Sequence, residues 1–347
     1  MEEKDKRVYG FAYIRAVSCI AIICLHTVFT AVGIYGKDVP NNELISYRIV
    51  IDNLMWAVPC FLMVTGALLL NKKKEISYHK LFTRYIGRIL LAILIFVFVF
   101  GVIDTFFGAE EPGIGVFFKQ MSEIITGQSW SHVWYLYCLI GLYLLLPFYK
   151  KIANASSKNE ITYLLLVYVI FLSIFPMLKN WGIEIGFYIH VSSIYPFYLF
   201  AGHYFWEYQN QREIRTVGLV AAVLGTGFLS VASWIGWAKE VDSLRVLFGY
   251  SSFFIIVQAY GIFQLFLSGE NKNPNFLGKL FLKIDENSFG IYLIHMIFVR
   301  FIFKQMGVNP FEKGGWFCIF ILISVITILS GVAVWLLKKI PIFRRIL

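Results

Sequence analysis

The first apolar segment of the chain carries an arginine and a histidine at a spacing that places both on one helix face. Arg15 and His26 lie eleven residues apart, which in an α-helix is about 17 Å along the axis and three turns plus about 20°. A guanidinium binds anions, and an imidazole with an unperturbed pKa of about 6.5 accepts a proton near neutral pH. The pair therefore places a positive charge and an imidazole at two depths of one helix face, as a pathway or site would, although snorkelling or an interhelical hydrogen bond would also account for each residue. Asp52 and Asn53 are further candidates for orienting the imidazole.

A second pair of basic residues begins the third apolar segment. Arg84 and Arg88 are four residues apart and would share one face of a helix. Two planar guanidinium groups on one face suit the oxygens of a phosphate. Arginines at this position also serve as ordinary charges at the cytoplasmic edge of a membrane. The spacing alone leaves both interpretations open.

Two later segments offer aromatic and imidazole groups that could line a cavity. His132 and Trp134 begin one segment, where a tryptophan can stack on a sugar or anchor the chain at the membrane interface. Ser288, Tyr292 and His295 fall at i, i+4 and i+7 and would share a helix face. They could line the site or form a hydrogen-bonded seam between helices. All five cysteines lie in apolar segments without metal-ligand spacing, so we predict no disulfide and no metal site.

The elements that must position these residues are membrane helices. Of the 347 residues, 59% are hydrophobic and 15% are charged, against about 45–50% and about 25% in soluble domains, and the mean hydropathy is +0.70. Such a composition excludes a soluble globule, a disordered chain and a coiled coil. Strand-length alternating patterns typical of outer-membrane barrels are absent. We therefore expect an all-α membrane protein, a polytopic bundle forming one domain over residues 1–347.

Ten runs are long and apolar enough to cross a bilayer core of about 30 Å, which takes about 20 residues. They are residues 8–35, 47–70, 84–107, 132–149, 161–178, 187–206, 217–237, 246–268, 287–306 and 316–337.

The distribution of lysine and arginine predicts the orientation of the bundle. Twenty-one of the 31 basic residues fall on the side that holds both termini, nine fall on the other side, and Arg15 lies within the first span. Since loops beside spans keep positive charge in the cytoplasm, both termini are expected inside the cell. The net charge of +10 then reflects topology and contact with anionic lipids. We expect a multi-pass protein of the cell membrane that binds no nucleic acid.

The longest connection between spans covers residues 108–131 and is expected outside the cell. Phe117, Phe118, Met121 and Ile125 recur within it at helical spacing, which predicts a short helix lying at the interface. This helix could cover a cavity that opens outward, or it could be a passive interfacial helix.

Five of the spans contain short motifs that occur in a recognisable order. They are YIRAVSCIAIICLHT at 13–27, VPCFLMVTGALLL at 58–70, TRYIGRIL at 83–90, SHVWYLYCLIGLYLLLP at 131–147 and NSFGIYLIHMIF at 287–298, with IPIFRRIL closing the chain. Together they resemble the motifs of the family-three integral-membrane acyltransferases, which acylate cell-surface polysaccharides and glycolipids. The similarity is to the branch of this family without an added extracytoplasmic domain, and we expect none here.

The resemblance implies a donor, an acceptor and a role for each basic residue. An acyl group, expected to be acetyl although succinyl stays open, would pass from cytoplasmic acyl-coenzyme A to a hydroxyl of a surface glycan or lipid-linked sugar. Arg84 and Arg88 would hold the phosphates of coenzyme A, with Arg15 further along the donor path. His26 would be the general base in direct transfer, or the carrier of a covalent acyl group.

One rival interpretation uses the same residues without acyl chemistry. A ten-span bundle with arginine and histidine at apolar depth also fits a transporter or flippase for an amino acid or a glycan. Such proteins commonly show inverted repeats and broken helices, and neither is clear in the sequence. A non-catalytic scaffold is a third interpretation, but it leaves the shared face of Arg15 and His26 unexplained.

Overall fold

The computed structural model describes residues 9–108, 111, 113–209, 214–267 and 274–347. These residues form helices, and no strand occurs among them, so the chain is an all-α protein. The chain divides into two compact units: Met1–Lys74 with Lys150–Ser288, and Glu75–Tyr149 with Phe289–Leu347. Five residues that enter the predicted charge balance lie outside the described part of the chain: Lys4, Lys6, Arg7, Arg212 and Lys272.

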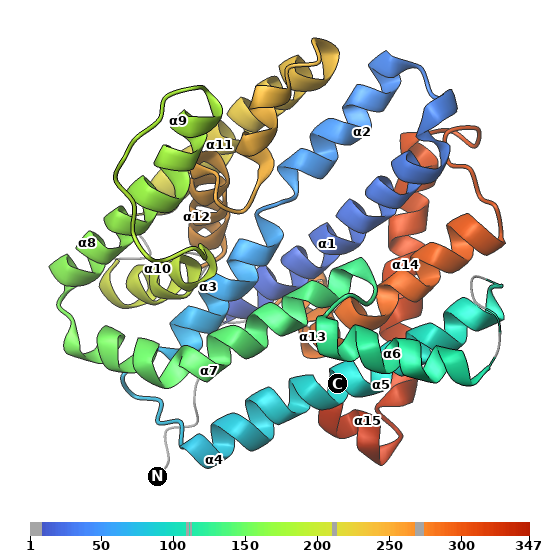
Figure 1. The fold of residues 1–347 in the computed structure, drawn as a ribbon, viewed down its shortest axis with the longest axis horizontal. Helices are drawn as coiled ribbons and strands as arrows, with labels where there is room; N and C mark the ends of the chain where they lie inside the picture. The colour runs from blue at the N-terminus through green and yellow to red at the C-terminus, as the bar shows by residue number, and fades with distance from the viewer. Residues whose placement is uncertain (1–8, 109–110, 112, 210–213, 268–273) are drawn as a thin grey trace. The chain divides into compact units, whose positions relative to one another are not determined.

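The first unit contains the long helices near the N-terminus and most of the helices after residue 150 (Figure 1). Its elements are α1 (Tyr9–Tyr35), the 3-10 turn η1 (Gly36–Asp38), α2 (Asn41–Asn53), α3 (Ala57–Leu69), α8 (Lys158–Val169), the π-helical turn η4 (Ile170–Ile174), α9 (Phe175–Asn180), α10 (Tyr195–Tyr208), α11 (Arg215–Ala238), the 3-10 segment η5 (Asp242–Phe248) and α12 (Phe253–Leu267). Residues 276–288 of α13 (Phe276–Arg300) also belong to it.

The second unit contains the rest of α13 and the helices on either side of the 108–131 connection. Its elements are α4 (Tyr78–Lys80), the π-helical turn η2 (Leu81–Ile86), α5 (Gly87–Phe106), α6 (Ile114–Thr126), the 3-10 turn η3 (Ser131–Val133), most of α7 (Trp134–Ala155), the π-helical turn η6 (Phe301–Gln305), α14 (Trp316–Leu337) and α15 (Pro341–Ile346). α6 therefore occupies the middle of the longest predicted connection.

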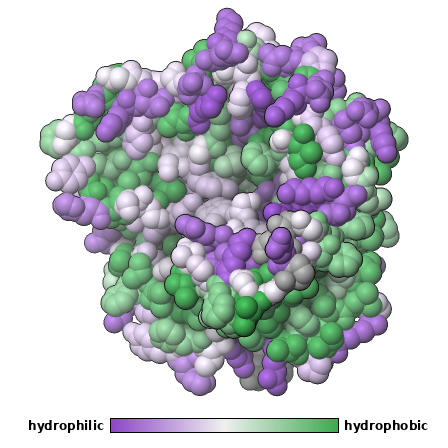
Figure 2. All heavy atoms as spheres, turned by 45° about the vertical axis from the view of Figure 1, so that its right-hand side comes forward, coloured by the Kyte–Doolittle hydropathy of each residue, from purple (hydrophilic) through white to green (hydrophobic). Residues whose placement is uncertain are grey.

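Nine helical runs within the described residues are long and apolar enough to cross a membrane. Large hydrophobic side chains on these runs face outward, as Val102, Leu224 and Phe317 do. Figure 2 shows hydrophobic side chains spread widely over the face that it draws. Exposure of this kind is costly in water and favourable in hydrocarbon. The chain is a polytopic helical membrane protein.

The sixth predicted span, 187–206, begins too early. Residues 183–194 form no helix, and α10 begins only at Tyr195. Phe187 and Tyr188 raised the apolar average, but both are exposed here. Pro196 lies in the first turn of α10, where its missing N–H costs nothing. With 14 residues, α10 is about 21 Å long, shorter than a bilayer core of about 30 Å.

The second predicted span, 47–70, is also not one continuous helix. It is broken into α2 and α3 by a turn at residues 54–56. Pro59 explains the break, because it has no N–H to donate to the carbonyl four residues earlier and its ring clashes there. The break leaves Asn53 at the C-terminal end of α2 inside an otherwise apolar run.

Two glycines allow α3 and α10 to cross at very close range. A Cβ atom added to Gly66 would lie 1.9 Å from the carbonyl oxygen of Leu199, and one added to Gly202 would lie 1.9 Å from that of Met63. Small residues at such crossings let helix backbones approach each other in membranes. This crossing is a fixed part of the first unit.

Candidate functional site

Arg15 is bound to an acidic residue of α13, and the two form a bidentate ion pair in the first unit. Its Nε donates to Asp285 Oδ1 at 2.6 Å and its Nη2 donates to Asp285 Oδ2 at 3.0 Å. The Asp285 side chain is only 5% exposed, whereas that of Arg15 is 28% exposed. A planar guanidinium matched to both carboxylate oxygens is held in one orientation. The charge that the sequence analysis placed at membrane depth is therefore compensated within the protein.

The same helix pair is joined one turn further along. Cys19 lies against the carbonyl oxygen of Ser288 at 3.8 Å, and the Ser288 hydroxyl donates to the carbonyl of Asp285 at 2.9 Å. Ser288 therefore belongs to the seam that positions Asp285. Asp285 was not predicted from the sequence, although a charged residue three positions before Ser288 and just before a predicted span was a visible signal.

His26 lies on α1, eleven residues beyond Arg15, and is half-buried. Asp52 was expected to orient its imidazole, but the structure directs that carboxylate to α11 instead. Asp52 Oδ2 accepts from Ser233 Oγ at 2.6 Å and from Trp237 Nε1 at 3.1 Å. Ser233 and Trp237 of α11 face α2 and provide the donors for this carboxylate.

Asn53 is likewise hydrogen-bonded to its own helix α2 and to the neighbouring helices α11 and α12. Its amide donates to the carbonyl of Ile49 at 2.9 Å and to Ser230 Oγ at 3.1 Å. Gln258 of α12 donates to the Asn53 carbonyl at 3.2 Å, so the carbonyl left without a helical partner at the break after α2 is satisfied. Asn53 closes the break between α2 and α3.

Arg84 and Arg88 lie in different environments in the second unit. Arg88 donates to the carbonyl oxygens of Ile346 at 2.5 Å and Leu347 at 2.9 Å, and its guanidinium lies 4.7 Å from the ring centroid of Phe289. Arg84, in the π-helical turn η2, is exposed, and it makes no hydrogen bond or ion pair with any residue that the structure describes. Arg88 anchors α15, whereas the donors of Arg84 face solvent.

His132, Tyr292 and His295 lie together in a buried cluster of the second unit. The His132 and His295 rings are 5.5 Å apart, and both side chains are buried. His132 Nε2 lies 3.1 Å from the carbonyl oxygen of Leu293, and His295 Nδ1 lies 2.7 Å from that of Tyr292. Carbonyl oxygens only accept, so these contacts assign the N–H of each ring to the named nitrogen. The Tyr292 hydroxyl donates to the His132 carbonyl.

Trp134, the remaining predicted acceptor contact, lies at the start of α7 beside this cluster. It is half-buried and packs edge-on against Tyr135, with ring centroids 6.0 Å apart. Tyr135 in turn packs against Tyr292 at 5.6 Å. The predicted residues of two segments are thus connected through aromatic contacts within one unit. They are His132 and Trp134 from one segment and Tyr292 and His295 from the other.

A further polar group beside the cluster was missed by the sequence analysis. Arg300 Nη1 donates to Asp104 Oδ1 at 2.5 Å, and Trp130 Nε1 donates to Asp104 Oδ2 at 2.7 Å. The Arg300 guanidinium also lies 3.9 Å from the ring centroid of Trp130, and that ring stacks on Phe100 at 4.3 Å. The group holds η3, and with it His132, against α5 and α13. Opposite charges near the ends of two predicted spans were the available signal.

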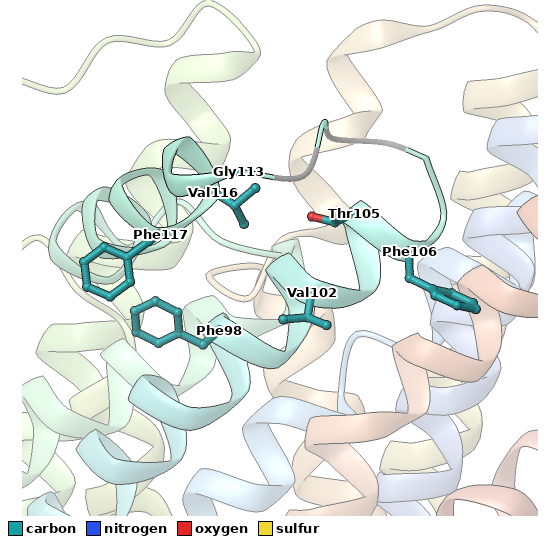
Figure 3. A pocket seen from close by; sticks show the side chains of 7 residues that line it. All are labelled: Phe98, Val102, Thr105, Phe106, Gly113, Val116 and Phe117. Carbon is teal, nitrogen blue, oxygen red and sulfur yellow. The ribbon is translucent and has the colours of Figure 1, made fainter.

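An apolar groove runs between α5 and α6 in the same unit (Figure 3). Its volume is about 480 Å³, and its lining residues are Phe98, Val102, Thr105, Phe106, Gly113, Val116 and Phe117. The Thr105 hydroxyl is bonded to the carbonyl of Gly101 at 3.0 Å, so the groove presents hydrocarbon surface. Its chemistry suits a lipid chain and provides no catalytic group.

Comparison of the sequence with known protein families finds one match over nearly the whole chain. The model of a family described as an acyltransferase domain matches residues 8–336, nearly the whole chain. The chain belongs to the acyltransferase 3 family. No solved structure matches the chain.

Curated relatives of this acyltransferase 3 chain carry names that refer to a polysaccharide. A protein of Staphylococcus aureus strain MSSA476, named "Probable poly-beta-1,6-N-acetyl-D-glucosamine export protein", is 26% identical over 359 residues, which cover 96% of this chain and 94% of that protein. A protein of strain MRSA252 with the same name is 25% identical over 357 residues, with the same coverage. The similarity spans both units.

Proposed function

We propose that this acyltransferase 3 protein moves an acyl group from acyl-coenzyme A to a hydroxyl of a cell-envelope polysaccharide or lipid-linked glycan. Membership of the family supports acyl transfer. The relatives named for poly-β-1,6-N-acetyl-D-glucosamine support a surface polysaccharide as the acceptor. The observation that carries the proposal is the arrangement on α1, where Asp285 holds Arg15 and His26 follows eleven residues later.

In the proposed reaction His26 accepts the proton of the acceptor hydroxyl as its oxygen attacks the thioester carbonyl. The new C–O bond forms, the C–S bond breaks, and the thiolate of coenzyme A leaves and takes up a proton. Arg15 lies about 17 Å from His26 along the helix axis, too far to contact the same carbonyl. Its proposed role is to organise the donor path, and the fixed guanidinium suits that role.

The donor phosphates have one exposed candidate ligand in the second unit. Arg84 has no acceptor among the residues that the structure describes, so its planar set of donors is open to a phosphate. Arg88 is bonded to two backbone carbonyls. We therefore assign phosphate binding first to Arg84, with Arg88 fixing the helix end beside it. Acetyl-coenzyme A is the proposed donor.

Substitution of the proposed base tests the reaction directly. Purified protein in lipid vesicles would be given radiolabelled acetyl-coenzyme A and envelope glycan, and the label in the glycan would be counted. His26→Ala is expected to lower transfer by a factor of about 100 or more, the contribution typical of a positioned general base. His79→Ala, which changes an exposed histidine of α4, is the matched control and should keep full activity. Full turnover by His26→Ala would remove His26 from the mechanism.

The names of the relatives favour a second candidate function, export of a polysaccharide without acyl chemistry. Sealed vesicles containing the protein distinguish the two. Net movement of glycan across the vesicle membrane without any acyl donor would support export. A glycan that gains an acyl mass, by mass spectrometry, only when the donor is supplied would support transfer.

A further inference from the structure

Arg48 of α2 lies over the ring of a tryptophan, and its hydrogen-bond donors have no acceptor among the described residues. Its Cζ is 3.9 Å from the ring centroid of Trp237, in the last turn of α11. Within the residues that the structure describes, Arg48 makes no hydrogen bond and no ion pair. Its side chain is half-buried in a membrane-crossing run, where an arginine normally has a counter-charge. The cation–π contact orients the guanidinium but leaves its N–H groups available.

The tryptophan that supports Arg48 is itself fixed in place. Trp237 Nε1 donates to Asp52 Oδ2 at 3.1 Å, and Ser233 Oγ donates to the same oxygen at 2.6 Å. Asp52 lies one turn from Arg48 on α2, yet it is bonded to α11 and not to the guanidinium. The ring is therefore held rigidly. The charge of Asp52 acts on Arg48 from one turn away, but the carboxylate bonds to α11, so the N–H groups of the guanidinium stay available.

A second arginine approaches the same ring from η5. Arg245 Cζ is 5.2 Å from the Trp237 centroid, and one of its nitrogens is bonded to Asp242 at 2.8 Å. The Arg245 side chain is 64% exposed, so this side of the ring is reached from solvent. Two guanidinium groups around one fixed indole form a site for an oxyanion, because planar donors match phosphate oxygens.

The location of this site, near helix ends, indicates a ligand at the membrane surface. Arg48 lies seven residues from the start of α2, about 10 Å along the axis, and Trp237 lies near the end of α11. Both helix ends lie at the end of the first unit where α1 also ends (Figure 1). Tryptophan and arginine at such ends are typical of the headgroup region.

We propose that Arg48, Arg245 and Trp237 bind a phosphate group carried by a membrane lipid. If the proposed function holds, that phosphate belongs to a lipid-linked glycan acceptor. His26 lies nine residues before the end of α1, about 14 Å from it, so a glycan held by its phosphate beside α2 would extend at a level comparable with that of the imidazole. The same chemistry would also accept the phosphate of an ordinary phospholipid headgroup.

Binding to the full-length protein, without any acyl donor, tests the site independently of catalysis. A short-chain polyprenyl phosphate would be titrated into protein in neutral detergent, and complexes would be counted by native mass spectrometry. Arg48→Gln is expected to weaken binding about tenfold or more, as loss of charge-assisted hydrogen bonds does. Arg245→Gln, on an exposed side chain, removes the second guanidinium with little effect on folding and should also weaken binding. Arg48→Lys should restore only part of the affinity.

Lys239→Gln is the matched control, because it removes one exposed positive charge two residues after Trp237. Its affinity should stay within about twofold of the parent. Equal weakening by Lys239→Gln, or no weakening by the Arg48 and Arg245 variants, would overturn the proposal. Phosphatidylglycerol and inorganic phosphate, titrated in parallel, identify the source: Arg48-dependent preference for polyprenyl phosphate supports the acceptor, equal binding of phosphatidylglycerol supports a headgroup, and Arg48-independent binding of every phosphate overturns the site. Intact acyl transfer in a variant that has lost polyprenyl phosphate binding would separate this site from the reaction.

Discussion

At the scale of single residues, the ion pair between Arg15 and Asp285 predicts that Asp285 contributes to the proposed donor path. If Asp285 orients Arg15, Asp285→Asn should lower acyl transfer about tenfold or more, because one charge-assisted bidentate contact is lost. Affinity for acyl-coenzyme A should change less than about threefold, since the guanidinium remains. Rates and donor affinity would be measured on the purified protein, with Asp285→Glu expected to recover part of the rate.

A double-mutant cycle separates this positioning role from a general loss of stability. Arg15→Gln and Asp285→Asn share one contact, so their combined effect on the rate should be clearly smaller than the sum of the single effects. Additive effects on the rate, with thermal unfolding shifted in parallel, would mean that the pair only stabilises the fold.

Candidate residues could be picked out from the sequence more readily than the partners that hold them. Arg15 and His26 stood out because charged and polar groups are rare at membrane depth. Asp285 did not, because it lies in a charged stretch just before a predicted span and its partner is 270 residues away. Asp52 was considered as a partner of His26 because it lies early in the second predicted span, and the structure bonds it to α11. Such pairings depend on which helices pack together, which one sequence does not reveal.

At the scale of elements, the close crossing of α3 and α10 predicts a strong sensitivity to one added methyl group. Gly202→Ala should destabilise the protein by about 1–3 kcal/mol, because its Cβ would overlap the backbone of Met63 and force the helices apart. Gly227→Ala in α11 is the matched control, since a Cβ there meets no atom within 4 Å. That control should be neutral or slightly stabilising. Thermal unfolding in detergent measures both, and equal stability of the two variants would contradict the close crossing.

Element boundaries were predictable where one long apolar run forms one helix, as in α1, α11 and α14. They were less so where proline or short polar residues interrupt an apolar average. Pro59 breaks the second span, and Ser192 and Ser193 interrupt the sixth before α10 starts at Tyr195. Hydropathy averaged over about 20 residues does not detect these breaks. The average depends on side-chain polarity and takes no account of the backbone hydrogen bonds that proline removes.

At the scale of the whole molecule, the charge distribution predicts which loops face the cytoplasm. Lys73 lies between α3 and α4, and Lys239 follows α11; both are exposed, and the positive-inside rule assigns them to opposite sides. A membrane-impermeant maleimide should therefore label Lys239→Cys in intact cells, and Lys73→Cys only after the membrane is permeabilised. The parent chain is the control for background, because its five cysteines are buried or half-buried in membrane helices. Labelling of Lys73→Cys in intact cells would invert the predicted orientation and place Arg15 nearer the outside than His26, which the proposed donor path does not allow.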